Sequence, residues 1–297
     1  MSGDVNTPSD TTSDRTSGQF GRSQSTAPGP KHILRTIIGR ELRTIVRTRT
    51  FFILALAFAA VVLGISSVSG SVQGGYVPTL VDLLTPLELL VPVVAIAFGY
   101  RAILGDAERG ELDVLKTYPV SSREIVAGVY VGRAIGLLTA IVAPLVVTVL
   151  LVFVAEEEGR TLYASHSGVD SPILFGRFIV LTILFALTVL AIAIAISAVV
   201  SGTRSAIALS VVALVVLLVG FDLALVYGFS AGSIGDGSLV YALALSPLSA
   251  YRGLVFESAI IVASGTGPAA ASPIASLVSL VVWTATSLGI ATWVLNR

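Results

Sequence analysis

The chain has 297 residues, of which 55% are hydrophobic and 12% are charged, and its formal net charge is zero. A soluble domain carries about 25% charged residues, so the composition excludes an ordinary soluble protein. The chain contains no cysteine, which excludes a disulfide framework and thiol chemistry. Its apolar residues fall in runs of about eighteen or more, as membrane-spanning helices require. We therefore expect an all-α integral membrane protein.

The first segment, residues 1–30, is rich in Ser, Thr, Gly, Asp and Pro, and Phe20 is its only aromatic residue. Such a segment cannot bury enough apolar surface to offset the cost of ordering it, so we expect a disordered cytoplasmic tail. It also lacks the basic and apolar regions of a signal peptide. The first apolar run is therefore expected to direct membrane insertion.

Residues 31–50 are predicted to form an amphipathic helix that lies in the headgroup plane. Arg40, Arg43 and Arg47 recur on one face at helical spacing, opposite a stripe of apolar residues. Glu41 is the exception, because it projects from the apolar stripe. Two interpretations stay open for Glu41: it pairs with a nearby arginine while its charge reaches the interface, or it docks into another part of the protein.

Six apolar segments follow, each long enough to cross the hydrocarbon core. Together they predict one six-span transmembrane domain over residues 51–297. The connection between the fifth and sixth segments is too apolar for a free loop, so we expect short helices at 239–245 and 254–263, resting on or dipping into the outer leaflet. The spans are predicted at residues 51–68, 83–104, 125–155, 173–200, 206–229 and 274–295.

The positions of lysine and arginine predict the orientation. Six of them precede the first span, between Lys31 and Arg49, whereas the following loop, residues 69–82, has none. Cytoplasmic loops carry the excess of basic residues, so both termini are expected in the cytoplasm and the protein in the plasma membrane. The strong preference for arginine over lysine favours a prokaryotic source, such as a haloarchaeon.

The most informative loop is residues 105–125, which joins the second and third spans. It is densely charged, and Leu112 and Leu115 are spaced to share one face of a short helix. Gly110 allows a tight turn, and Pro119 ends the helical piece. The loop is either a solvated connector or a surface that contacts a cytoplasmic partner.

The third span begins with a recognisable helix signal. Ser121 and Glu124 stand three residues apart just before the apolar run. This spacing is that of a capping box, in which the serine and the glutamate satisfy each other's backbone N–H groups. We therefore predict that the helix begins at this pair.

Three motifs resemble signatures of the type-2 ABC transporter permeases. Residues 108–112 followed by 117–125 are similar to the family's Glu-x-Gly-Thr-Leu … Pro-Val-Ser-Arg signature. Residues 39–42 with 47–49 resemble its amphipathic elbow helix. Residues 246–252 resemble an Asn-Pro-x-x-x-Tyr/Phe-Arg element of the subgroup near the permease of the nitrous-oxide-reductase maturation transporter.

The resemblance covers about residues 33–295, with Glu111 in place of the family's Thr and Ser246 in place of its Asn. It implies a permease that pairs with a second protomer and is powered by a separate cytoplasmic ATPase. Because the chain has no phosphate-binding Gly-x-x-x-x-Gly-Lys-Ser/Thr loop, ATP and Mg²⁺ are expected on that partner, and no cofactor on this chain.

The resemblance also implies roles for particular residues. Those of the coupling surface for the ATPase would be Glu108, Arg109, Gly110, Glu111, Leu112, Leu115, Tyr118 and Pro119. Those of the elbow helix, which would brace this contact, are Arg40, Glu41, Arg43 and Arg47. The motif of the outer helices would consist of Pro247, Tyr251 and Arg252.

Two acidic residues lie deep within predicted spans, Glu88 and Asp222. A charge at the bilayer centre costs at least roughly 2.5–3.5 kcal/mol, so each is a candidate for the substrate path. Other ionisable residues, including Arg133, lie nearer the predicted span ends, where the side chain can reach the interface.

Two other functions are weighed against a permease. A secondary transporter or channel would need symmetric halves or more deep charges than this sequence has. An intramembrane zinc protease would need clustered histidines, but His32 and His166 fall on opposite sides of the membrane. With no Cys and only Met1, the chain is also poorly equipped to carry copper, so we expect no metal.

Among other partners, we expect membrane lipid and no nucleic acid. The substrate is expected to move outward. Its identity stays open between a lipid-like molecule, a peptide and a sulfur-containing compound.

Overall fold

The computed structural model describes residue 3 and residues 30–111, 120–158, 170–232, 238, 241–264 and 271–297. Within these ranges the regular elements are all helices, with no strand. Six helical segments are long and apolar enough to cross a membrane, which confirms the predicted all-α, six-span fold. The predicted disordered tail lies almost wholly outside the described residues.

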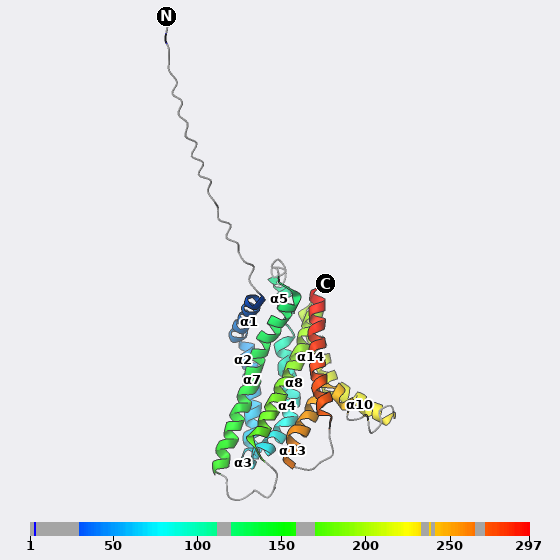
Figure 1. The fold of residues 1–297 in the computed structure, drawn as a ribbon. Coiled ribbons are helices and arrows are strands. Elements are labelled where there is room, and N and C mark those ends of the chain that lie inside the picture. The colour runs from blue at the N-terminus through cyan, green and yellow to red at the C-terminus, as the bar shows by residue number, and fades with distance from the viewer. Residues whose placement is uncertain are drawn as a thin grey trace.

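The helices follow the chain in a simple order, and Figure 1 shows the long ones side by side in one bundle. Their bounds are α1 Pro30–Arg47, α2 Arg49–Val68, α3 Ser71–Gly74, α4 Tyr76–Gly99, α5 Leu104–Glu108, α7 Ser122–Glu158, α8 Pro172–Val199, α9 Thr203–Val215, η1 Val216–Gly220, α10 Phe221–Ser230, η2 Leu243–Leu245, α12 Pro247–Val255, η3 Phe256–Ile260, α13 Ile261–Ser264 and α14 Pro273–Leu295. The second span continues from α4 through α5, and the fifth consists of α9, η1 and α10.

Local sequence signals explain where several helices begin. The predicted capping box is present, with the Ser121 N–H donating to Glu124 Oε2 at 2.9 Å and the Glu124 N–H donating to Ser121 Oγ at 3.3 Å. In three other helices a serine cap precedes a proline in the first turn, where proline lacks only an N–H that would be unsatisfied anyway. These pairs are Ser171–Pro172, Ser246–Pro247 and Ser272–Pro273.

Helix α8 forms the centre of the bundle and packs between α4 and α14 (Figure 1). Phe175, Phe178 and Phe185 of α8 are fully buried. Close packing against α4 depends on Gly99, where a Cβ atom would meet the Ala193 Cβ at 2.5 Å. In contrast, α2, the fifth span and α14 bury only a small share of their residues, as helices that face lipid or another protein do.

The segment between the fifth and sixth spans contains the predicted short helices, with shifted bounds. Where a helix was predicted at 239–245, residues 241 and 242 are helical and lead into the short 3₁₀ helix η2. The helix predicted at 254–263 lies within a continuous helical run from Pro247 to Ser264. The run begins early because the Ser246 hydroxyl caps it, accepting the Ser249 N–H at 3.3 Å. Trp283, ten residues into α14, donates its indole N–H to the Leu245 carbonyl at 3.0 Å. This contact places the start of the run about 15 Å along α14, inside the bundle.

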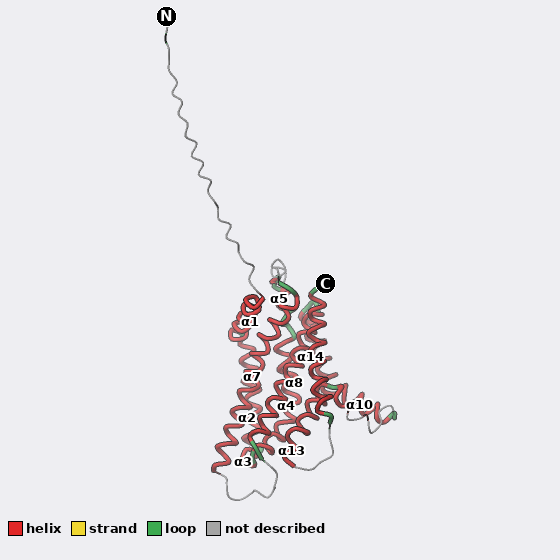
Figure 2. The backbone as a smooth tube through the Cα atoms, in the orientation of Figure 1, coloured by secondary structure: helices red, strands yellow, loops and turns green. Residues whose placement is uncertain are grey.

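The two ends of the bundle carry different elements. Helices α1 and α5 and the C-terminus lie together at one end, and α3 and α13 lie at the other (Figures 1 and 2). We refer to these as the α1–α5 end and the α3–α13 end.

Candidate functional site

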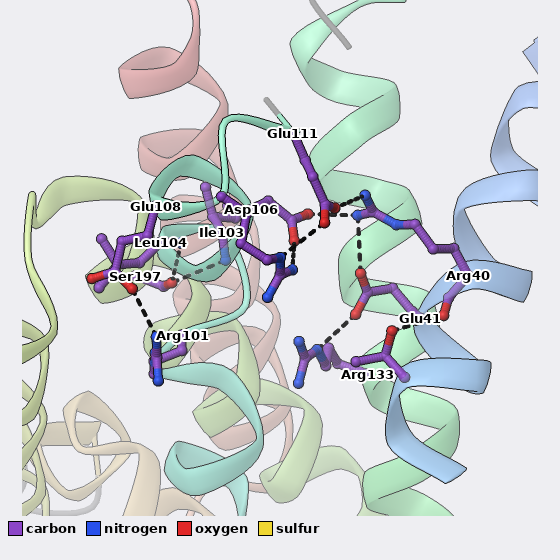
Figure 3. Close-up of polar contacts among 12 residues, drawn as sticks. Arg40, Glu41, Arg101, Ile103, Leu104, Asp106, Glu108, Glu111, Arg133 and Ser197 are labelled. Atoms are coloured by element: carbon purple, nitrogen blue, oxygen red, sulfur yellow. Dashed lines mark hydrogen bonds and ion pairs between the residues drawn. The ribbon is translucent and has the colours of Figure 1, made fainter. Parts of the chain in front are cut away.

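Charged side chains gather around α5 in what we call the α5 charge cluster: Arg40, Glu41, Asp106, Arg109, Glu111 and Arg133 (Figure 3). The Arg40 guanidinium contacts three carboxylates, those of Asp106, Glu41 at 3.1 Å and Glu111 at 2.8 Å. Arg109 contacts Asp106 at 2.7 Å and Glu111 at 2.8 Å. Two arginines thus hold the same two carboxylates, which joins α1 to the start of the predicted coupling loop.

The surroundings of Arg40 keep it charged. Burial alone would lower the pKa of its guanidinium, but the negative charges of Asp106, Glu41 and Glu111 outweigh this effect, and the pKa lies above its ordinary value. Asp106 is itself only 3% exposed. A buried carboxylate needs such a partner, so the link between α1 and α5 depends on Arg40.

Glu41 docks into α7, the second of the two alternatives left open by the sequence. It is 2% exposed, and its Oε2 lies 2.8 Å from Nε of the buried Arg133. This contact is an ion pair rather than an aligned hydrogen bond. Arg133 also donates to the Phe98 carbonyl at 3.3 Å, and its guanidinium lies 5.4 Å from the centre of the Phe51 ring.

Helix α1 packs on two glycines of α7. Gly128 and Gly132 lie one turn apart, directly beneath Ile37 and Glu41. A Cβ atom at either glycine would lie under 3.0 Å from those side chains. Small residues at this spacing let two helices approach closely, so α1 is fixed on α7 in one register.

Helix α5 is also bonded to the ends of α8 and α9. The Ser197 hydroxyl of α8 accepts the backbone N–H groups of Ile103 and Leu104, each at 3.0 Å (Figure 3). Glu108 accepts from Arg101 and from the Thr203 hydroxyl at the start of α9, each at 2.7 Å. A displacement of α5 would therefore act on α1, α8 and α9 together.

The predicted coupling surface falls partly in the described residues. Glu108, Arg109 and Glu111 take part in the contacts above, and Gly110 adopts a left-handed φ of 71°, as a tight turn requires. The remaining predicted residues, Leu112, Leu115, Tyr118 and Pro119, lie outside the described residues. The coupling role of all eight stays a prediction.

A second charged group links three helices: Glu88 of α4, Asp222 of α10 and Arg252 of α12. We call it the midplane triad, after the position of Glu88 halfway along α4. Arg252 donates to both carboxylate oxygens of Glu88, at 2.8 and 2.6 Å, and its Nη1 lies 3.7 Å from Asp222 Oδ2. Asp222 also accepts the Ser249 hydroxyl at 2.9 Å. The sequence singled out Glu88 and Asp222 as deep acidic residues and Arg252 as part of the outer-helix motif, and the structure brings all three together.

The other residues of the outer-helix motif position Arg252. Pro247 stands in the first turn of α12. Tyr251 is fully buried and stacks on Phe185 at a ring separation of 4.7 Å, and its hydroxyl lies 3.0 Å from that of Thr182. Tyr251 thereby anchors α12 on α8, and the next residue, Arg252, reaches α4.

Asp170 has a role that the sequence analysis missed. Its two carboxylate oxygens accept the Tyr76 and Val77 N–H groups, each at 2.8 Å, at the beginning of α4. Gly75 precedes them with a positive φ of 108°. This capping starts α4 earlier than the predicted residue 83. The sequence analysis did not single out Asp170, because nothing in the local sequence shows that it lies beside a distant helix end.

Within the described ranges, no three His, Cys, Asp or Glu side chains are grouped so that they could hold a metal ion. That this chain carries no metal stays a prediction.

Comparison with known proteins adds independent information. Residues 35–297 match the profile of the ABC-2 family transporter proteins, a range that includes all six spans. The chain is 32% identical over 255 residues to the probable ABC transporter permease protein NosY of Pseudomonas aeruginosa, covering 82% of this chain and 86% of that protein. It is 28% identical over 226 residues to the protein of the same name from Stutzerimonas stutzeri, covering 73% of this chain and 78% of that protein.

Proposed function

Since the chain belongs to the ABC-2 family of transporter proteins and is the permease subunit of an ABC transporter, we propose that a separate ATPase docks at its α1–α5 end and drives an unidentified substrate outward. ATP and Mg²⁺ are then bound by the ATPase, because this sequence has no phosphate-binding loop.

The observation that carries this proposal is the bonding of α5. Its charged residues are tied to α1 through Arg40, and Glu108 is tied to α9 through Thr203. The backbone just before it is held by Ser197 of α8. A partner that pushes on the loop after α5 would move several spans at once, as a power stroke requires. An ordinary connector would need none of these contacts.

The proposed orientation places the α1–α5 end, with both termini, at the cytoplasmic face of the plasma membrane. It is supported by the arginines of α1 and by the positive-inside rule. The chain has no cysteine, so a thiol reagent labels a variant only at its single introduced cysteine and shows which side of the membrane that position faces. In intact cells, Val68→Cys should react with a membrane-impermeant maleimide, and Arg204→Cys should react only after the cells are permeabilised.

We further propose that two protomers complete the transport pathway. The first and fifth spans are the least covered within the chain, and their exposed side chains are mostly valine, leucine, isoleucine and phenylalanine. A second permease subunit, identical or related, would cover part of this surface. The midplane triad would then border the substrate path, because Arg252 and Asp222 each leave more than a third of their side chains exposed.

Affinity purification of the full chain from its host membranes in mild detergent tests the proposal. We expect an ATPase to co-purify with the wild-type chain, and we expect Arg109→Glu combined with Leu112→Glu to reduce its recovery severalfold. Arg204→Glu, at the same end but outside the cluster, is the control and should retain the ATPase. Equal recovery with all three chains would contradict docking at this loop, and absence of any ATPase would contradict the proposal as a whole.

A further inference from the structure

Helix α1 carries arginines that the α5 charge cluster leaves free. Arg43 and Arg47 lie one turn apart, both are exposed, and no ion pair joins either to a carboxylate within the described ranges. Arg40 lies one turn earlier and keeps 34% of its side chain exposed. An open hollow of about 670 Å³ lies over this face, and its described lining residues are Thr36, Gly39, Arg40, Arg43, Thr44 and Arg47.

This arginine face is held in place by the rest of the fold. Ile37 and Glu41, on a neighbouring face of α1, are fixed on Gly128 and Gly132 of α7, so α1 is not free to rotate. Only Thr48 separates the end of α1 from the first membrane-spanning helix, α2. The arginines therefore lie where a spanning helix enters the bilayer, at the depth of lipid headgroups.

The helix that follows α1 exposes apolar side chains, which suits a lipid as well. The first two turns of α2 expose Phe52, Ile53 and Leu56, at 59%, 67% and 72%. A cationic hollow just before a spanning helix with exposed apolar side chains matches a molecule with an anionic head and an apolar tail. An acidic protein segment would match the arginines but not the apolar surface.

We propose that the arginine face of α1 binds the phosphate of an anionic phospholipid, with Arg43 and Arg47 as its ligands. Residues at this spacing have Cβ atoms about 5–6 Å apart, so both side chains can reach one phosphate. A guanidinium can donate two parallel hydrogen bonds to phosphate oxygens, which a lysine cannot.

Binding at this site would be sensed by α5. Arg40 borders the same hollow and also holds Asp106 and Glu111. A phosphate beside Arg40 competes with these carboxylates for its N–H groups. The composition of the membrane would thereby affect how firmly α5 is tied to α1.

The test is a titration of the purified full chain, in neutral detergent, with phosphatidylglycerol or phosphatidylcholine, with bound lipid counted by native mass spectrometry. We expect phosphatidylglycerol to bind more tightly. One basic side chain near an anionic surface changes affinity roughly fivefold, so Arg43→Gln with Arg47→Gln should weaken phosphatidylglycerol binding roughly 30-fold. Binding of phosphatidylcholine should not change, which also shows that the variant is folded.

The matched control is Arg123→Gln with Arg204→Gln, which removes the same charge from exposed arginines at the same end. Equal weakening by both pairs would overturn the proposal, since it would show a general effect of charge. So would equal binding of the two lipids, or displacement of phosphatidylglycerol by millimolar inorganic phosphate, which would indicate a soluble ligand. Arg43→Lys with Arg47→Lys keeps the charge but loses the paired hydrogen bonds, so it should weaken phosphatidylglycerol binding, though by less than the glutamine pair. The titration needs no ATPase, so its failure leaves the proposed function untouched.

Discussion

Glu41 and Arg133 are charges that would be costly to bury alone. Their side chains are 3% and 10% exposed and lie 2.8 Å apart. Glu41 also contacts the less buried Arg40 at 3.1 Å, whereas Glu41 is the carboxylate paired with Arg133. Removing one partner of a buried pair leaves an uncompensated charge and costs about 3–5 kcal/mol, whereas replacing both with apolar residues is often close to neutral.

Glu41→Gln is therefore expected to lower the free energy of unfolding by about 3–5 kcal/mol, because Arg133 stays buried without its counter-charge. The double variant Glu41→Met with Arg133→Met should recover most of the loss. Denaturation of the purified chain in detergent, followed by circular dichroism, measures both. If the double variant were as unstable as the single one, the ion pair would not be the reason for the loss.

The sequence could identify Glu41 but not its partner. A carboxylate on an apolar stripe is anomalous from spacing alone, so Glu41 stood out. Its partner depends on how α1 sits on α7, which is set by packing against two glycines and not by any local pattern. Arg133, close to a predicted span end, was accordingly interpreted as a side chain that reaches the interface.

At the scale of elements, α1 can pack closely on α7 because Gly128 and Gly132 of α7 carry no side chains at the contact. Gly132→Ala should destabilise the protein and release α1, because the added methyl group would overlap Glu41. Gly289→Ala, in the interior of α14, meets nothing within 4 Å and should stabilise the protein by up to about 1 kcal/mol. Melting temperatures of the two variants in detergent provide the comparison. Shifts in the same direction would contradict the assigned role of Gly132.

In the midplane triad, Arg252 is held more strongly by Glu88 than by Asp222. Glu88 and Arg252 share two short hydrogen bonds, whereas Asp222 lies 3.7 Å from Arg252 and is 37% exposed. Double-mutant cycles with alanine should give a coupling energy of about 1–3 kcal/mol for Glu88 and Arg252. For Asp222 and Arg252 the coupling should be below about 1 kcal/mol, as for exposed pairs. A larger value for the second pair would mean that Asp222, not Glu88, holds α12.

Helix periodicity and hydropathy predicted the six spans, because a bilayer admits long apolar helices and little else. They also predicted short helices between the fifth and sixth spans but misplaced the start of the second one. The Ser246–Pro247 cap determines the start of α12, seven residues before the predicted residue 254. The beginning of α4 was also missed, since its cap, Asp170, comes from another part of the chain.

At the scale of the whole molecule, the fifth span connects the two charged centres. It begins at Thr203, which donates to Glu108 beside the α5 charge cluster, and beyond η1 it carries Asp222 of the midplane triad. The same span is the least covered by the rest of the chain. A displacement of α5 can thus reach the triad through the hydrogen bond from Thr203 to Glu108 and then along the fifth span, which is little covered by the rest of the chain.

The central claim is that an ATPase operates this permease from its α1–α5 end. The most direct measurement is site-specific cross-linking in native membranes, with Arg109→Cys at that end and Val68→Cys at the other, in a chain that has no other cysteine. We predict that a cross-linker joins position 109 to an ATPase subunit, that ATP changes the yield, and that position 68 gives no such product. Cross-linking of position 68 to the ATPase, or of neither position, would contradict the account.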